Sequence, residues 1–208
     1  MVIVLTGFEP YGEESYNPSG DIVKKFNGLN FMGEEIVGVV LPVSFAKVKG
    51  LLENLVLNHK PRILLSLGLA PRASCIRIER IAINIMDSGP DNDGYKPVDE
   101  PIIAGGPTAF FSTLPIKAIV KRMLDLGIPA YISNSAGTFL CNCVMYLGLY
   151  FMDRFNVNGK AGFIHIPYTI EQASSKLKTG VRGEPPPSMN FNDILNAIKV
   201  ALEVSLQS

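Results

Sequence analysis

Short runs of β-branched and aliphatic residues alternate along the chain with longer stretches in which apolar positions recur at helical spacing. The short runs predict strands at Val2–Leu5, Ile36–Val40, Ile63–Leu67, Ala130–Ser133 and Gly162–His165. The longer stretches predict helices at Pro18–Phe26, Ser44–Asn58, Leu114–Leu126, Thr138–Phe155, Thr169–Lys178 and Asn192–Leu206, with Thr169 and Gln172 as a capping box. This alternation predicts a three-layer α/β domain around a mainly parallel sheet.

The segment Ile76–Ile85 is a strand candidate with an irregular pattern. Its isoleucines move from even to odd positions between Ile78 and Ile81, which predicts a bulge or bend there. Glu79 shares the parity of the later isoleucines, so a buried face would point its carboxylate inward, where it needs a partner. The alternative is a surface ion pair of Glu79 with Arg77 or Arg80.

No internal repeat and no shift in composition marks a linker within the 208 residues, so residues 1–208 are expected to form one domain. The Pro/Gly-rich stretches 89–107 and 180–187 are interpreted as active-site or contact loops. Lys plus Arg equals Asp plus Glu at 19 each, which leaves no global field to attract nucleic acid or anionic lipid. A small or neutral substrate fits this balance better.

The N-terminus and the cysteines indicate a cytoplasmic protein. The apolar start runs at once into Thr6-Gly7, without a basic region or an apolar stretch long enough for export or for spanning a bilayer. Three cysteines, at 75, 141 and 143, are an odd and sparse set that suits reduced thiols better than a disulfide framework.

Cys141 lies where the polar turn after Ser133 passes into a long apolar helix. With Thr138 as the expected N-cap, Cys141 falls in the first helical turn. The free N–H groups and the positive dipole end of a helix start stabilise a thiolate and can later stabilise an oxyanion. Cys141 is therefore a candidate nucleophile, and the alternative is that it is only a small buried hydrophobe.

The chain has two histidines, of which His165 is the candidate catalytic base. His59 precedes Lys60-Pro61 at the end of a helix and is expected to be structural. His165 ends a predicted strand, and the carboxyl ends of parallel strands share one edge of a sheet, so it can meet the Cys141 segment there. Glu79 is the candidate acid that would orient His165. Taken alone, His165 could also be an ordinary core or loop histidine.

Metal and nucleotide signals are weak, and no cofactor is expected. Cys141 and Cys143 are two residues apart on a helix and point about 200° away from each other, so they cannot share a metal through one helix face. The stretch Asp91–Gly94 fits a turn better than a calcium loop, because Gly89 stands where the first carboxylate belongs. The glycines lack the patterns that cradle phosphates.

Seven motifs spread over nearly the whole chain resemble the pyroglutamyl peptidase I family, cysteine-type omega peptidases that remove an N-terminal pyroglutamate from peptides. The most specific is the Ser-Asn-Ser-Ala-Gly run from Ser133 that continues to Leu140-Cys141-Asn142. The others are Thr6–Gly12 with Asn17–Ser19, Glu79–Asn84, Pro90–Gly94, Pro107–Pro115, His165–Tyr168 and Pro186–Met189.

The resemblance implies an α/β/α sandwich around a twisted sheet, without metal or organic cofactor, assembled as a dimer or tetramer. It implies Cys141 as nucleophile, His165 as general base and acid and Glu79 as the orienting acid, acting through a thioester acyl-enzyme. The implied pocket for the neutral, flat pyrrolidone ring is formed by Phe8, Tyr11, Asn17, Phe139 and Leu140. N-terminally pyroglutamylated peptides would be the partners, with no role for nucleic acid or membrane.

Two departures from the family pattern concern the pocket. Tyr11 stands where many relatives have phenylalanine, so its hydroxyl either makes the pocket more polar or packs outside it. The loop Asp87–Asn92 is one residue shorter than usual and lacks the family's arginine.

Two other functions are alternatives to a pyroglutamyl peptidase. A glutamine-amidotransferase-like enzyme would carry glycines beside the nucleophile, where this chain has Leu140 and Asn142. A phosphorylase-like or non-catalytic binding protein could share the sheet architecture, but a phosphorylase needs a basic, glycine-rich phosphate site, and none is convincing here.

Overall fold

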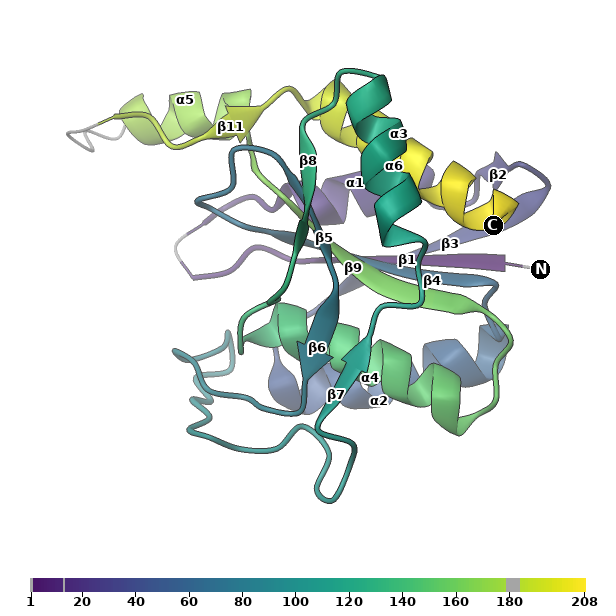
Figure 1. The fold of residues 1–208 in the computed structure, drawn as a ribbon. Coiled ribbons are helices and arrows are strands. Elements are labelled where there is room, and N and C mark those ends of the chain that lie inside the picture. The colour runs from purple at the N-terminus through teal and green to yellow at the C-terminus, as the bar shows by residue number, and fades with distance from the viewer. Residues whose placement is uncertain (1, 13, 179–183) are drawn as a thin grey trace.

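The computed structural model describes residues 2–12, 14–178 and 184–208. A main sheet contains seven strands in the order β2-β3-β1-β4-β9-β5-β8 (Figure 1). Their bounds are Val2–Phe8 (β1), Asn30–Phe31 (β2), Glu34–Leu41 (β3), Ile63–Leu69 (β4), Ile76–Glu79 (β5), Ala130–Ser133 (β8) and Lys160–Ile166 (β9). The four central strands β3, β1, β4 and β9 are parallel, whereas β2 runs antiparallel to β3 and β5 antiparallel to β9. The prediction of a mainly parallel sheet is confirmed.

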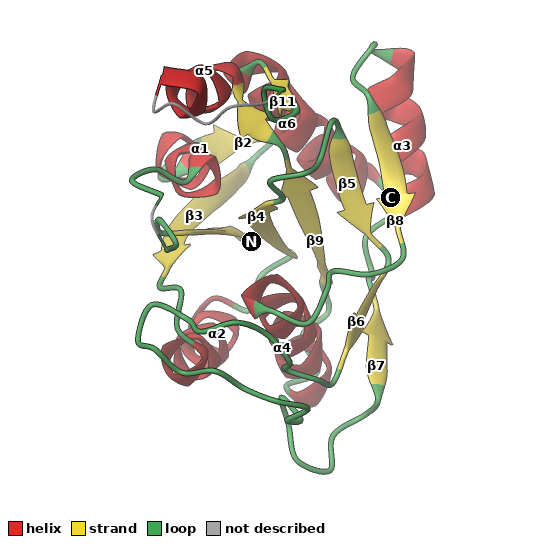
Figure 2. Ribbon diagram, turned by 90° about the vertical axis from the view of Figure 1, so that its left-hand side faces the viewer, coloured by secondary structure: helices red, strands yellow, loops and turns green. Residues whose placement is uncertain are grey.

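Helices cover both faces of this sheet (Figure 2). Helices α1, α3 and α6 pack on one face and α2 and α4 on the other, so the predicted α/β/α sandwich is confirmed. The helices span Pro18–Phe26 (α1), Phe45–His59 (α2), Ile116–Asp125 (α3), Leu140–Arg154 (α4), Ile170–Lys178 (α5) and Phe191–Gln207 (α6). The capping box at the start of α5 is present, because Thr169 and Gln172 exchange two side-chain to backbone hydrogen bonds of 3.2 and 3.3 Å.

Two small sheets accompany the sandwich. Strand β6 (Ile81–Ile83) pairs antiparallel with β7 (Ala109–Phe111), and β10 (Tyr168–Thr169) pairs parallel with β11 (Ser188–Met189). Helix α5 and β11 extend to one side of the sandwich in Figure 1. Of the predicted contact loop 180–187, residues 180–183 lie outside the described part of the chain.

The predicted bend after Ile78 is confirmed, but the predicted face of the later isoleucines is wrong. The chain leaves the main sheet at Arg80, whose N–H donates to the Ser133 carbonyl, and continues as β6 in a different sheet. In β6 it is Ala82 that is buried, while Ile81 and Ile83 are only half-buried. Side-chain parity therefore does not continue through the bend, because the two strands belong to sheets with different orientations.

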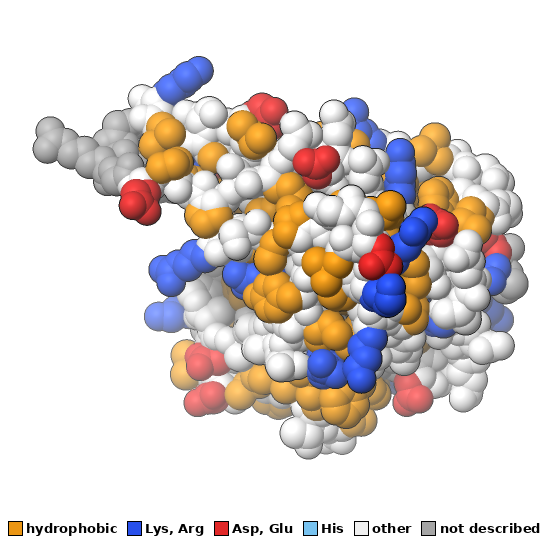
Figure 3. Space-filling model, turned by 45° about the horizontal axis from the view of Figure 1, so that its top comes forward, with side chains coloured by type: hydrophobic (Ala, Val, Ile, Leu, Met, Phe, Trp, Pro, Cys, Tyr) orange, Lys and Arg blue, Asp and Glu red, His pale blue; other side chains and the backbone are white. Residues whose placement is uncertain are grey.

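The face of the molecule seen in Figure 3 shows no dominance of one charge. Lysine and arginine side chains alternate with aspartate, glutamate and apolar side chains over the face seen in Figure 3. Among the described residues, no helix combines the length and the apolar character needed to span a membrane.

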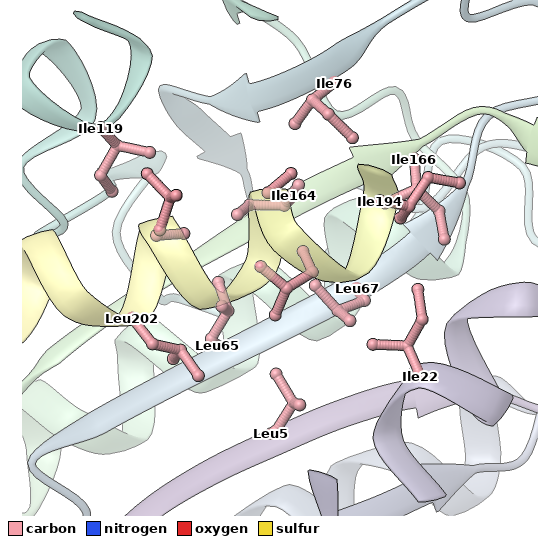
Figure 4. Close-up of a cluster of buried hydrophobic side chains, with 14 of the residues drawn as sticks. Leu5, Ile22, Leu65, Leu67, Ile76, Ile119, Ile164, Ile166, Ile194 and Leu202 are labelled. Carbon is pink, nitrogen blue, oxygen red and sulfur yellow. The ribbon is translucent and has the colours of Figure 1, made fainter. Parts of the chain in front are cut away.

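Strand residues alternate between two apolar clusters, one on each face of the sheet. Leu5, Leu65, Leu67, Ile164 and Ile166 face helices α1, α3 and α6, as Figure 4 shows. Their neighbours Val4, Leu64 and Phe163 belong to the cluster with α2 and α4. Strands buried on both faces read as continuous apolar runs, and this is why the central strands could be recognised from the sequence.

We expect Ile164→Ala to destabilise the fold strongly. Ile164 is fully buried in the central strand β9 against α6, so its truncation leaves a cavity and should lower the free energy of unfolding by about 2–5 kcal/mol. Urea unfolding measures this change. Leu57→Ala on α2, where the side chain is 43% exposed, is the control and should change the free energy of unfolding by less than about 0.5 kcal/mol.

Candidate active site

A buried hydrogen bond joins Glu79 to His165. Glu79 is 0% exposed and His165 8% exposed, and Glu79 Oε1 lies 2.7 Å from His165 Nδ1. Because a carboxylate can only accept, Nδ1 carries the proton in this bond. Glu79 is therefore not an exposed ion-pair partner of Arg77 or Arg80.

The antiparallel pairing of β5 with β9 creates this contact. His165 lies opposite Arg77, and continuing the register places Glu79 beside Phe163, diagonal to His165 on the same face. A diagonal neighbour on a sheet is within reach of a long side chain such as glutamate. That face is the one covered by α4, because Phe163 packs in the cluster of α2 and α4.

Cys141 is the second residue of α4 and therefore lies at the amino end of this helix. The residue at the N-cap is Phe139, with extended backbone and no side-chain cap, so the prediction of Thr138 as N-cap is wrong. The Thr138 hydroxyl donates instead to the Asp87 carbonyl at 2.5 Å. The first N–H groups of α4 therefore have no capping side-chain oxygen and remain available to another acceptor.

The structure brings Cys141 and His165 together. Cys141 lies close enough to His165 to raise the pKa of its imidazole. Gly68 of β4 lies opposite His165 in the parallel register, and a Cβ atom at Gly68 would lie only 2.8 Å from Cys141 Sγ. The sulfur thus packs directly against the β4 backbone beside the imidazole, at a position where no side chain fits.

The environment of His165 favours the imidazolium ion. Burial by itself lowers the pKa of the imidazole, but the charge and hydrogen bond of Cys141 and the hydrogen bond and charge of Glu79 outweigh it and raise the pKa of His165 to about 9. Both neighbouring groups thus favour the protonated form of the ring, and Glu79 does so through the bond at Nδ1.

His59 lies apart from this site. It is half-buried in the last turn of α2, which leads to the amino end of β4, whereas His165 lies near the carboxyl end of β9.

A cleft of about 1050 Å³ opens beside Cys141. All five residues of the expected pocket line it: Phe8, Tyr11, Asn17, Phe139 and Leu140. Phe8 ends β1, Tyr11 and Asn17 belong to the following loop, and Phe139 and Leu140 immediately precede Cys141. The cleft is thus formed at the carboxyl edge of the parallel strands, as the strand order predicts.

The wall beside Cys141 is aromatic. The rings of Tyr11 and Phe139 are 5.0 Å apart between centroids, and Phe45 packs edge-on against Phe139 at 5.5 Å. The Tyr11 hydroxyl is directed out of this stack and donates to the Pro90 carbonyl at 3.1 Å. It therefore tethers the shortened loop at Asp87–Asn92 to the pocket.

Asn17 contributes to the cleft mainly as a structural residue. Its Oδ1 accepts the Ser19 N–H at 3.1 Å as the N-cap of α1, and its Nδ2 donates to the Glu9 carbonyl at 2.9 Å. These bonds fix the loop that carries Tyr11.

Sequence reasoning missed a further wall of the cleft, around Glu14. Tyr168 donates to Glu14 Oε1 at 3.0 Å, Lys176 forms an ion pair with the same carboxylate, and Tyr16 also lines the cleft. The His165–Tyr168 motif contained the signal for Tyr168, and the Pro186–Met189 motif begins with another residue that lines the cleft. Gly68 was missed as well, although a glycine inside a strand often indicates a close approach of another group.

No group of three or more potential metal-binding side chains occurs in the part of the chain that is described. Asp91 forms a turn, because its carboxylate accepts the N–H groups of Phe45, Asp93 and Tyr95 at 2.9 to 3.0 Å. All three cysteines are free thiols, and Cys143 is 2% exposed in the core, where burial raises the pKa of its thiol to about 12.

We expect Glu79→Gln and Cys141→Ser each to lower the pKa of His165, because each removes a negative group that stabilises the imidazolium. In the unchanged protein the His165 resonance should titrate near pH 9. The measurement is an NMR titration of the imidazole protons, which His59→Gln simplifies to a single histidine. A titration of His165 near its ordinary value in the unchanged protein would contradict this account.

Sequence and structure comparisons identify the same family. The model of the pyroglutamyl peptidase family matches residues 1–208. A pyrrolidone-carboxylate peptidase of Pyrococcus furiosus is 49% identical over 208 residues, which cover 100% of this chain and 99% of the relative. One of Yersinia pseudotuberculosis is 43% identical over 206 residues, 99% of this chain and 93% of the relative. A solved structure of a mutant pyrrolidone carboxyl peptidase from P. furiosus has a TM-score of 0.95 at 49% identity, covering 100% of this chain and 99% of that one. The chain therefore belongs to the pyroglutamyl peptidase family.

Proposed function

We propose that this protein is a cysteine peptidase that removes N-terminal pyroglutamate from peptides through a thioester acyl-enzyme. The observation that carries the proposal is the buried Glu79–His165 hydrogen bond, with the Cys141 sulfur packed against Gly68, the neighbour of His165 on β4, at the edge of a large cleft. The names of the relatives, pyrrolidone-carboxylate peptidases, support the choice of substrate.

The proposed reaction begins with the thiolate of Cys141. Glu79 holds the Nδ1 proton, so Nε2 is the nitrogen that exchanges a proton with the thiol. The sulfur attacks the carbonyl carbon of the pyroglutamyl residue, and the tetrahedral intermediate collapses with cleavage of the amide C–N bond. The His165 imidazolium gives its proton to the departing amine, which leaves the pyroglutamyl thioester.

Water completes the cycle. His165, now neutral, accepts a proton from the water as it attacks the thioester carbonyl, and the C–S bond breaks to release pyroglutamate and the Cys141 thiolate. Both steps build negative charge on the same carbonyl oxygen. The uncapped N–H groups at the start of α4 are the proposed donors to it, and one such donor contributes about 3 kcal/mol of transition-state stabilisation.

The cleft favours a flat, neutral ring. The aromatic faces of Tyr11 and Phe139 can bury the pyrrolidone ring, and the ring needs no counter-ion. Proline has a similar shape but lacks the ring carbonyl. A pocket group that bonds this carbonyl would be left unpaired with proline, which penalises prolyl peptides more strongly than their shape favours them.

We further infer that residues 1–208 act as one catalytic unit in the cytoplasm, as a dimer or tetramer. A reducing compartment keeps a catalytic thiol in its active form, and three free cysteines agree with such a compartment. The balanced charge gives no reason to expect nucleic acid or membrane as a partner. The oligomer rests on the resemblance to the family.

Hydrolysis of pyroglutamyl and prolyl chromogenic amides, with a thiol present, tests the proposed function. We expect release from the pyroglutamyl amide alone, and its loss in Cys141→Ser and after iodoacetamide treatment. Cys75→Ser, which removes a half-buried thiol away from the cleft, is the matched control and should retain activity. No release by folded protein from either amide would refute the peptidase assignment.

We expect Gly68→Ala to lower kcat/KM by about 100-fold, because the added methyl group would overlap Cys141 Sγ and the ring of Phe163 and displace the nucleophile. Gly162→Ala is the matched control on β9. Its methyl group would press on the side-chain ends of Leu114 and Ser112, away from the sulfur. Kinetics and urea unfolding of both variants separate the two effects. Equal losses of activity at equal stability would contradict the role given to Gly68.

A further inference from the structure

The residue after the proposed nucleophile, Asn142, is buried against β6. It is 1% exposed and stands in the first turn of α4, where successive side chains point about 100° apart. Cys141 therefore faces the cleft while Asn142 faces the neighbouring strand. Figures 1 and 2 both show β6 beside α4.

The side-chain amide of Asn142 forms hydrogen bonds with the main chain of this segment, in the way that a neighbouring strand would. Its Oδ1 accepts the Ile83 N–H at 2.9 Å, and its Nδ2 donates to the Ile83 carbonyl at 2.9 Å and to the Ile85 carbonyl at 3.0 Å. The donor and acceptor pattern fixes the orientation of the amide. Three main-chain groups of the segment after β5 are thus satisfied by one side chain of α4.

This segment is also the chain that carries Glu79. Only three residues lie between Glu79 and Ile83. The connection is fixed at Arg80, whose N–H donates to the Ser133 carbonyl and whose carbonyl accepts the Ser112 N–H, each at 2.8 Å. The Glu79 carboxylate bonds His165, and the main chain at Ile83 bonds Asn142. These two groups therefore have little freedom to move relative to each other.

A second pair of bonds fixes the other end of the same segment. The Asp87 N–H donates to the Thr138 carbonyl at 3.2 Å, and the Thr138 hydroxyl donates to the Asp87 carbonyl. The turn that leads into Cys141 therefore lies along residues 83–87 and is held at both of its ends. A rotation or slide of the first turn of α4 would break these bonds and leave buried polar groups unpaired.

We propose that Asn142 is a positioning residue that sets the place of the Cys141 sulfur relative to the Glu79–His165 pair. It acts through the main chain of β6 and touches neither the sulfur nor the imidazole in this role. The expected effect on kcat rests on the proposed function. The geometric part of the inference concerns only the distance between the Cys141 sulfur and the His165 imidazole.

The chain contains a matched control in Asn84. Its Oδ1 accepts the Ile103 N–H at 2.9 Å, and its Nδ2 donates to the Ile103 and Gly106 carbonyls at 2.8 and 3.5 Å. The bonding pattern is the same as that of Asn142, but it joins β6 to the loop at 103–106 and does not involve α4. The same substitution at both positions therefore removes similar bonds with different expected effects on the site.

The experiment compares Asn142→Leu with Asn84→Leu, since leucine has the shape of asparagine without its hydrogen bonds and adds no charge. Both variants should lose stability in urea. We expect kcat for the pyroglutamyl amide to fall at least tenfold in Asn142→Leu and to stay within about twofold in Asn84→Leu, with KM little changed in either. Asn142→Ser and Asn84→Ser, which need less repacking, replace the pair if a leucine variant does not fold.

The NMR titration of His165 is the second readout, and it requires no substrate. Displacement of the sulfur should lower the pKa of His165 in the Asn142 variants toward its value in Cys141→Ser, and leave it unchanged in the Asn84 variants. An unchanged kcat together with an unchanged titration in folded Asn142 variants would overturn the proposal. If the unchanged protein cleaves no pyroglutamyl amide, the proposed function fails, while the titration alone still decides whether Asn142 positions the sulfur.

Discussion

The buried hydrogen bond between Glu79 and His165 is the interaction on which the rest of the site depends. Burial of a carboxylate is costly unless a partner stabilises it, and His165 bonds one oxygen of Glu79, which is 0% exposed. The bond requires β5 to run antiparallel to β9, because the diagonal relation of the two side chains arises from that register. The antiparallel pair β5–β9 is thus the pair that brings Glu79 and His165 together.

The second requirement is that α4 begins directly beneath this pair. The helix lies in the apolar cluster with α2, and its uncapped first turn points Cys141 at the imidazole and free N–H groups at the cleft. Gly68 permits the sulfur to approach the sheet, and the amide of Asn142 fixes the turn from the other side. Close packing on one face and hydrogen bonding on the other together determine one position for the Cys141 sulfur, the proposed nucleophile.

The rigid part of the site and its cleft are built from different kinds of structure. Glu79 and His165 lie on strands of the main sheet and Cys141 on a buried helix, which suits groups whose relative positions must stay fixed. The pocket residues Tyr11 and Asn17 lie instead on a loop that is tied by side-chain bonds to neighbouring loops. Loops carried by a rigid scaffold can vary in sequence without disturbing the scaffold, so departures from the family pattern, such as Tyr11, occur in this loop.

Local sequence pattern was enough to predict the helices, the central strands, the bend after Ile78 and the residues that could carry chemistry, because each depends on periodicity, on capping or on a motif. It did not determine the face of Glu79, the N-cap at Phe139, the place of Gly68 or the wall around Glu14. Each of these depends on contacts between segments far apart in the chain, and local pattern contains no information about them. The prediction that Glu79 points inward is confirmed, but the parity argument behind it was wrong, since the bend transfers the chain to another sheet. Tertiary structure alone decided that these residues meet.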